Sequence, residues 1–377
     1  SILFGMAIGY IIMYSRNPVH QVGRNKSLIE IVDNYQEIVQ NYYGEIDEKK
    51  LSEEAIKGMV KSLNDSNSNY MDEDVTNSFN ITVDGSFVGI GVVIVYENEY
   101  NRVIEVYSDS PAEKAGIQVD DIILKVDGKD AKGLYGESIT SLIKGEVGSK
   151  VKIVVKRGEE EKNFTITRGT IDIQSVSSDV ISFDNRKIGY IKITSFSDTT
   201  YKQFSKSLKK IEKESIDSLI LDVRDNPGGH LQQVTDVLSV FFPKKTALFQ
   251  VETKDKKDTI YSNSKESRKY PIMVLINHGS ASASEILASC FQDNYANGLI
   301  IGNTSYGKGT IQKSVSLKTG TSFKYTTQKW LTSKGKWLHE KGVTPDIAVN
   351  QSEEYSQNPV YENDAQLQEA LRQIKES

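Results

Sequence analysis

The sequence predicts a multidomain α/β protein, with a small β-rich domain inserted before the α/β core and helical segments at both ends. Three observations indicate this fold class. Strand-like apolar runs alternate with amphipathic helical patterns after about residue 169, the stretch before it consists mostly of short strands, and apolar residues recur every three or four positions near both ends. A chain of 377 residues is long enough for several domains.

The N-terminal part of the chain begins with an apolar segment. Its first fifteen residues, SILFGMAIGYIIMYS, carry no charge, which is typical of a signal or anchor segment, although about 20 residues are needed for a span. We therefore expect export of the protein and association of its N-terminus with a membrane. The predicted parts of the chain are the apolar segment with its tether at 1–26, a helical region at 27–77, the small domain at 78–168, the core at 169–350 and a helical tail at 351–377.

Charge and cysteine content restrict the possible functions. The formal net charge is −5, and Cys290 is the single cysteine. A chain without an extended basic field is a poor general nucleic-acid binder, so we expect no nucleic-acid partner. One cysteine can form neither an internal disulfide nor a multi-cysteine zinc site. Cys290 lies in a helical pattern, where we expect a small buried side chain rather than a nucleophile.

The helical region and the tail show the spacing of amphipathic helices. In the N-terminal region, apolar side chains recur at Leu28, Ile31, Tyr35, Ile38 and Tyr42, and a polar stretch, NDSNSNYMDED, ends the pattern. The tail carries the similar pattern DAQLQEALRQIKES. Both segments are therefore predicted to be helical.

The small domain is predicted from its strands and its turn residues. GIGVVIVYE and RVIEVY are strand-like, and in SPAEKAG, Ser110 is suited to cap a short helix that Gly116 ends. DDIILKVDGKDA is a strand that runs into an Asp-Gly turn, and KVKIVVKRGEEEKNFTIT is a hairpin. The block resembles a PDZ domain. This resemblance implies that a C-terminal carboxylate and apolar side chains bind at Phe87, Val88, Gly89, Ile90 and Gly91.

The core is predicted from alternation of strands and helices. IGYIKITSF, SLILDV, IMVLIN and GLIIG are apolar strands, separated by the helical patterns TYKQFSKSLKKIEKE, HLQQVTDVLSVFF and ASEILASCFQDN. This alternation favours a parallel sheet with crossover helices. Functional residues are then sought where the strands end and the helices begin.

A lysine in the glycine-flanked turn GNTSYGKGT raises the possibility of nucleotide binding. A phosphate-binding loop needs Ser or Thr directly after its lysine and a helix that follows. Here Gly309 follows Lys308, and the next residues, TIQKSVS, alternate as a strand does. Nucleotide binding is therefore disfavoured, and the lysine needs another explanation.

A serine-rich turn, GSASASEI, precedes one of the core helices. Ser282 and Glu285 form a capping-box pattern, which is the structural interpretation of this serine. The catalytic interpretation is a nucleophile beside the free N–H groups at the start of a helix. None of the four histidines has the position of a triad base, whereas a desolvated lysine can act as a general base. Lys308 would pair with Ser282, and Gln312 would lie two pleats away on the same strand face and orient it. Ser280 and Ser284 remain alternative nucleophiles.

Four motifs occur in one order along the core. GSASASEI, YGKGTIQ, DVRDNPGG and GVTPDI together resemble the carboxyl-terminal processing (tail-specific) proteases, which also contain a PDZ domain. The resemblance implies a ClpP/crotonase-like core, a Ser282 nucleophile, a Lys308 base and a Gln312 partner. It also implies an oxyanion hole at Ala283, Gly228 and Gly229, and a role for Arg168 in coupling the PDZ domain to the active site. A homodimer formed through the N- and C-terminal helices is a further expectation from this resemblance.

The resulting functional prediction is a serine endopeptidase that captures protein substrates by their apolar C-terminal tails and cleaves them through an acyl-enzyme. Such an enzyme needs no metal and no nucleotide. We expect an extracytoplasmic location at a bacterial cell envelope, either anchored or secreted. The alternative is a catalytically inactive PDZ-type scaffold that binds peptides, although every catalytic residue type is present.

Overall fold

The computed structural model describes residues 25–265 and 267–377. The apolar segment at 1–15, which is predicted to be a signal or anchor, lies outside the described residues. Within them, no helix combines the length and the hydropathy that a membrane span requires. The chain divides into two compact units, residues 1–71 with 314–325, and residues 72–313 with 326–377, and each is described by itself.

The described part of the first unit, from residue 25 onward, contains two helices. α3 (Lys26–Asn41) begins at Asn25, whose side chain accepts hydrogen bonds from the N–H groups of Ser27 and Leu28. α4 (Glu48–Lys61) is capped in the same way by Asp47. The short strand β1 (Asn69–Met71) pairs antiparallel with residues 322–324 of β18. The apolar side chains predicted along the first helix remain largely exposed in the described chain, among them Ile31, Ile38 and Tyr42.

The second unit begins with a helix that the sequence pattern does not predict. α5 (Glu73–Asp84) starts where the Asp72 carboxylate accepts a hydrogen bond from the Val75 N–H, and it ends at Gly85, whose φ is +63°. The helix lies in polar sequence, and most of its surface is exposed. Capping rather than apolar periodicity therefore defines it.

The small domain is a six-stranded sheet with two helices, which agrees with the predicted short strands and two helices. Its core contains Val103, Ile123, Ile139, Val151 and Ile153, all at most 1% exposed. The elements of this domain are β3 (Val92–Glu97), β4 (Tyr100–Val106), α6 (Pro111–Ala115), β5 (Ile122–Val126), β6 (Lys129–Asp130), α7 (Glu137–Ile143), β7 (Lys150–Arg157) and β8 (Glu160–Thr167). The segments that enter and leave the domain, β2 (Ser86–Gly89) and β9 (Gly169–Asp172), pair antiparallel with each other.

The turn residues of the small domain have the predicted roles. Ser110 Oγ accepts a hydrogen bond from the Glu113 N–H, 3.1 Å away, and Gly116 ends the helix with φ +93°. Asp127 and Gly128 both have positive φ, +46° and +80°, as a type I′ turn between β5 and β6 requires. These positions confirm the sequence prediction of a short helix and a tight hairpin.

The core sheet has six strands in the order β10-β11-β12-β15-β16-β19. β10 pairs antiparallel with β11, and every other neighbouring pair is parallel, which confirms the predicted α/β arrangement. The strands are β10 (Val176–Phe183), β11 (Arg186–Ile193), β12 (Ser218–Asp222), β15 (Ile272–Ile276), β16 (Gly298–Gly302) and β19 (Ile347–Ala348). β12 and β15 are buried along their whole length.

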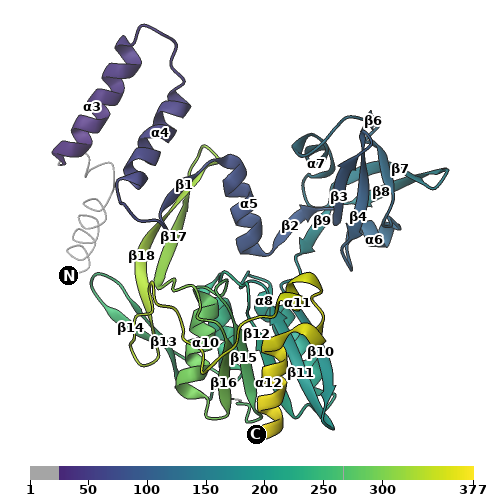
Figure 1. The fold of residues 1–377 in the computed structure, drawn as a ribbon. Helices are drawn as coiled ribbons and strands as arrows, with labels where there is room; N and C mark the ends of the chain where they lie inside the picture. The colour runs from purple at the N-terminus through teal and green to yellow at the C-terminus, as the bar shows by residue number, and fades with distance from the viewer. Residues whose placement is uncertain (1–24, 266) are drawn as a thin grey trace, which may run out of the picture. The chain divides into compact units, whose positions relative to one another are not determined.

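Helices cover both faces of this sheet (Figure 1). One face packs against the helices α8 (Thr200–Glu212), α9 (Leu231–Ser239) and α10 (Ala283–Asn294). The other face packs against α12 (Ala365–Glu376), through Leu367, Ala370, Leu371 and Ile374. The C-terminal tail, which also contains α11 (Glu353–Gln357) and a 3-10 turn (Tyr361–Asn363), therefore forms one layer of the core.

A second sheet contains the strands β13, β14, β17 and β18, together with β1. β13 (Ala247–Glu252) and β14 (Lys257–Tyr261) form a hairpin, and β13 also pairs with residues 329–332 of β18 (Ser322–Thr332). β17 (Thr310–Ser316) pairs with β18, as the alternating sequence after the lysine predicts. Trp330 of β18 is fully buried against the core.

Candidate active site

The serine loop, residues 277–282, connects the buried strand β15 to the start of α10. Ser282 immediately precedes the helix and has φ +53° and ψ −112°. A positive φ is unusual for a residue with a Cβ and costs about 1–3 kcal/mol unless neighbouring contacts fix it. The helix start therefore holds this serine in a strained conformation, which an ordinary cap does not need.

The three serines of this loop have different surroundings. Ser280 and Ser284 are both 0% exposed, and their hydroxyls donate to the carbonyls of Val223 and Asn226 at 2.8 and 2.9 Å. Ser282 is half-buried, so solvent and a substrate can reach it. Accessibility thus separates Ser282 from the two alternatives that the sequence leaves open.

The lysine turn, residues 303–309, lies between β16 and β17. Lys308 is half-buried, and its carbonyl accepts a hydrogen bond of 2.7 Å from Trp330 Nε1. The next residue, Gly309, donates its N–H to His339 Nδ1 and accepts from Trp337 Nε1. A Cβ on Gly309 would lie 2.7 Å from Trp337 Nε1, so only glycine permits this close approach.

The turn corrects one detail of the sequence prediction. β17 begins at Thr310, so Lys308 precedes the strand, and the expectation that Lys308 and Gln312 share one strand face is wrong. Gln312 Nε2 donates to the hydroxyls of Thr310 and Thr326 at 2.9 and 3.2 Å. Lys308 lies in a tight turn between Gly307 and Gly309, so the alternation of side chains along an extended strand does not apply to it.

The Glu285 carboxylate joins the serine loop to the lysine turn. Its Oε2 accepts from the N–H of Ser282 at 2.7 Å and from the N–H of Lys308 at 2.9 Å. Its Oε1 accepts from the N–H of Gly307 at 2.7 Å and from Ser305 Oγ at 2.6 Å. The backbone atoms of the predicted nucleophile and the predicted base therefore lie within hydrogen-bonding reach of one oxygen atom.

The glycine loop, residues 225–229, follows β12 and packs against the serine. A Cβ on Gly228 would lie 2.8 Å from Ser282 Cβ and 2.9 Å from the Ala283 nitrogen. The Gly228 N–H donates to the Asn226 side chain at 2.8 Å. Among the described residues, the N–H groups of Ala283 and Gly229 have no acceptor. These two amides are free to bind an oxyanion.

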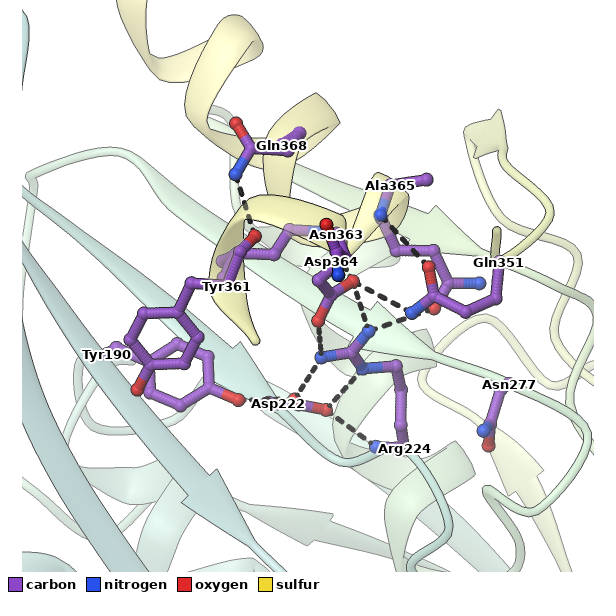
Figure 2. A network of polar contacts seen from close by, with 12 residues as sticks. Tyr190, Asp222, Arg224, Asn277, Gln351, Tyr361, Asn363, Asp364, Ala365 and Gln368 are labelled. Atoms are coloured by element: carbon purple, nitrogen blue, oxygen red, sulfur yellow. Dashed lines mark hydrogen bonds and ion pairs between the residues drawn. The ribbon is translucent and has the colours of Figure 1, made fainter. Parts of the chain in front are cut away.

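The glycine loop is anchored by a buried charge network at its base (Figure 2). The Arg224 guanidinium, 5% exposed, bridges the carboxylates of Asp222 and Asp364, with nitrogen–oxygen distances of 2.6 to 2.9 Å. Tyr190 donates its hydroxyl to Asp222 at 2.6 Å, and Asp364 also accepts the Gln351 amide at 2.9 Å. The network thereby connects the end of β12 to the start of α12.

The network changes the titration of its members. Burial on its own would raise the pKa of Asp364, but hydrogen bonds and the charge of Arg224, with a hydrogen bond from Gln351, lower that pKa below its ordinary value. Burial raises the pKa of the Tyr190 hydroxyl, and the negative charge of Asp222 raises it further. Asp364 is therefore ionised and Tyr190 neutral at neutral pH, as the ion pair and the donated hydrogen bond require.

The predicted peptide-binding residues and the predicted coupling residue, Arg168, lie at different positions in the small domain. Phe87, Val88, Gly89, Ile90 and Gly91 line one groove, together with Thr140, Ile143 and Lys144. Arg168 is 8% exposed and donates to the carbonyls of Leu142, Ile143 and Lys150 and to Ser149 Oγ. Because Ile143 belongs to both sets, the Arg168 side chain contacts the helix end that borders the groove.

Cys290 and two histidines have other surroundings in the structure. Cys290 is fully buried, and burial raises its pKa to about 12, which confirms that it is a core side chain. His339 Nδ1 accepts from Gly309, and His230 Nε2 lies 3.2 Å from the Val83 carbonyl and 3.4 Å from Asp198. Neither imidazole is placed as the base of a Ser-His pair.

A partly exposed, strained serine, two free amides beside it and a lysine turn joined to it define the class of a serine hydrolase, here with an added peptide-binding domain. Comparison with known proteins gives the family. The model described as Peptidase family S41 matches residues 187–349, that of the PDZ domain matches 88–167, and that of the activating protease CtpB N-terminal domain matches 13–75.

Individual proteins similar to this chain indicate the same family. The chain is 36% identical to carboxy-terminal processing protease CtpB of Bacillus subtilis over 93% of its own length and 72% of the relative. It is 38% identical to CtpA of the same organism, over 83% and 67%. The solved photosystem II D1 C-terminal processing protease aligns over 86% of this chain and 87% of its own, with 26% identity and a TM-score of 0.50. The protein belongs to peptidase family S41 and is a serine-type C-terminal processing peptidase with a PDZ domain.

Proposed function

We propose that the protein cleaves unfolded proteins with a Ser282–Lys308 dyad after its PDZ domain has captured their apolar C-terminal tails. The observation that carries the proposal is the shared oxygen of Glu285, which accepts hydrogen bonds from the backbone of both dyad residues. The accessibility of Ser282, compared with the burial of Ser280 and Ser284, supports its assignment as the nucleophile.

The chemistry proceeds through an acyl-enzyme. Neutral Lys308 accepts the proton of the Ser282 hydroxyl while the oxygen attacks the scissile carbonyl. The amides of Ala283 and Gly229 stabilise the oxyanion, because neither has another acceptor among the described residues. The lysine, now protonated, gives its proton to the leaving amine, the peptide bond breaks, and water releases the acyl group by the same steps.

The lysine must be neutral to act as a base. The ordinary pKa of a lysine is about 10.4, so the proposed mechanism requires a site that favours the neutral amine. Gln312 is an uncharged partner that can orient the amine without raising its pKa. Its own amide is held by Thr310 and Thr326.

The groove of the PDZ domain suits a C-terminal tail. Its lining is mostly apolar, and the amides of Gly89 to Gly91 follow the strand β2, in the pattern of a carboxylate-binding loop. Lys144 adds a positive charge at the same groove, which favours a terminal carboxylate. The proposed ligand is therefore an extended peptide with an apolar last residue and a free carboxylate.

The proposal is tested with the wild-type chain and an unfolded protein substrate that ends in an apolar residue. We expect cleavage that continues at full rate in EDTA and without added nucleotide, because the Ser-Lys mechanism uses neither. Products are identified by mass spectrometry. Tail binding without any cleavage would instead support the inactive scaffold, and loss of cleavage in EDTA would contradict the mechanism.

Tail recognition is tested by placing a charge in the groove. Val88→Glu is expected to weaken the binding of a peptide with an apolar, free C-terminus by about tenfold or more, because a carboxylate is desolvated there and repels the terminal carboxylate. Binding is measured by fluorescence anisotropy, with an amidated peptide as the reference for carboxylate recognition.

The matched control is Val95→Glu on β3, where the side chain is exposed. It adds the same charge to the same domain outside the groove and is expected to leave the affinity unchanged. Equal effects of the two variants, or equal affinity of the free and amidated peptides, would be inconsistent with tail capture at this groove.

A further inference from the structure

We propose that Glu285 is a positioning residue for catalysis, which fixes the distance between the nucleophile and the general base. The inference rests on the proposed dyad, since it concerns how Ser282 and Lys308 are held together. In the sequence pattern, Glu285 is only the glutamate of a capping box, three residues after Ser282. Its contacts in the structure go well beyond that role.

The Glu285 carboxylate is completely buried and fully hydrogen-bonded. It is 0% exposed and accepts four hydrogen bonds of 2.6 to 2.9 Å, two at each oxygen. A buried carboxylate is costly unless its lone pairs are occupied, and four donors occupy them. The N-terminal position on α10 adds favourable interaction with the helix dipole. Both oxygens of this carboxylate therefore have hydrogen-bond donors.

The positions of the four donors in the chain show that Glu285 does more than cap the helix α10. A capping box requires only the bond from the Ser282 N–H. The other three donors are Ser305 Oγ and the N–H groups of Gly307 and Lys308, all in the lysine turn, 20 to 23 residues further along the chain. Three of the four hydrogen bonds of this carboxylate thus bind the turn that contains the proposed base, Lys308.

Glu285 binds two residues with positive φ, of which only Ser282 is strained, because glycine adopts such a φ without cost. Ser282 has φ +53° and Gly307 has φ +89°. The carboxylate binds the N–H of each of these residues. Strained conformations persist only where the surroundings determine them, and a misplacement of about 1 Å at reacting groups can cost roughly 10²-fold in rate. Loss of the carboxylate would release the serine and the lysine together.

The direct test is Glu285→Gln in the full-length enzyme. Glutamine has the same shape, but its NH₂ group would face two N–H or O–H donors, so two of the four bonds are lost. We expect kcat to fall by about 10²-fold while KM changes by less than about twofold, because the PDZ groove and the outer substrate contacts are untouched. The matched control is Glu212→Gln, which removes a carboxylate that also joins distant segments of the core, through Arg268 and Tyr270, away from the serine.

Folding and positioning are separated by two further measurements. The buried thiol of Cys290 reacts with a thiol reagent only if α10 opens, so its continued protection in Glu285→Gln shows that the helix is intact. Ser305→Ala removes one donor to the carboxylate and also the acceptor of the Val343 N–H, and we expect a fall in kcat of about threefold to tenfold.

The outcomes differ for the two proposals. A normal kcat in Glu285→Gln and Ser305→Ala, in an enzyme that Ser282→Ala inactivates, overturns the positioning role alone. Cleavage that survives Ser282→Ala and Lys308→Ala overturns the dyad. A fall in kcat of equal size in Glu212→Gln, or exposure of Cys290, would assign the effect of Glu285 to general stability.

Discussion

Replacing Ser282 with alanine is expected to lower kcat by roughly four to six orders of magnitude, which places cleavage below detection in most assays. In the proposed mechanism, the hydroxyl oxygen of Ser282 forms the acyl bond next to the amides of Ala283 and Gly229. Lys308→Ala is expected to have a comparable effect, because it removes the proposed proton acceptor. Cleavage of an unfolded substrate with an apolar tail is measured for each variant.

Two controls make this result specific. Ser284→Ala removes a hydroxyl two residues away that donates to the Asn226 carbonyl, and it should retain substantial activity with some loss of stability. The double variant of Ser282 and Lys308 should be no slower than either single variant, because residues that act as one unit are not additive. Activity lost in Ser284→Ala and kept in Ser282→Ala would move the nucleophile to Ser284.

Replacing Arg224 with methionine is expected to destabilise the core by about 3–5 kcal/mol. Methionine has a similar length but no charge, so the carboxylates of Asp222 and Asp364, each at most 3% exposed, would be left buried without their cation. The measurement is the midpoint of thermal unfolding of the purified chain. Loss of the anchor should also reduce activity, because Arg224 stands at the base of the glycine loop.

The matched control is Arg372→Met on α12. Arg372 forms ion pairs with Glu369 and Glu376 on an exposed helix surface, where such pairs contribute little. The same change of residue type should therefore leave the unfolding midpoint nearly unchanged. A small effect of Arg224→Met, equal to that of the control, would show that the buried network does not stabilise the fold.

The same network predicts how stability depends on pH. The pKa of Asp364 is lower in the folded protein than in the unfolded chain. Its contribution is therefore complete above the unfolded value of about 3.9, and it is lost as the pH falls through the lower folded value. Removing Arg224 should weaken this acid-side dependence, because the lowered pKa originates largely in that guanidinium.

The sequence predicts those parts of the fold that depend on local pattern. Buried strands, amphipathic helices and the turns at Gly116 and Gly128 follow from residue spacing and from glycine chemistry, and the structure contains them. The α5 helix is missed because capping by Asp72 defines it rather than apolar spacing. The hairpin of β13 and β14 has no strong apolar alternation, and its pairing with β18 becomes visible only in three dimensions.

For the candidate site, the sequence predicts residues but not the hydrogen bonds that connect them. Ser282, Lys308 and the glycine pair follow from motifs and from the failure of the nucleotide interpretation. The bridging role of Glu285 depends on a fold that brings the lysine turn back to the helix start. The pair of Arg224 and Asp364 joins residues 140 positions apart. One clue was available, because DVRD places charged residues directly after an apolar strand.

The contacts of the lysine turn have a practical consequence for spectroscopy. The chain contains two tryptophans, and their indole N–H groups donate to the carbonyls of Lys308 and Gly309. Trp330 is fully buried, whereas Trp337 is 44% exposed and stacks on His339. Tryptophan fluorescence therefore originates beside the proposed base, from one indole that is shielded and one that quenchers can reach. Movement of this turn on substrate binding can be followed in the unlabelled enzyme.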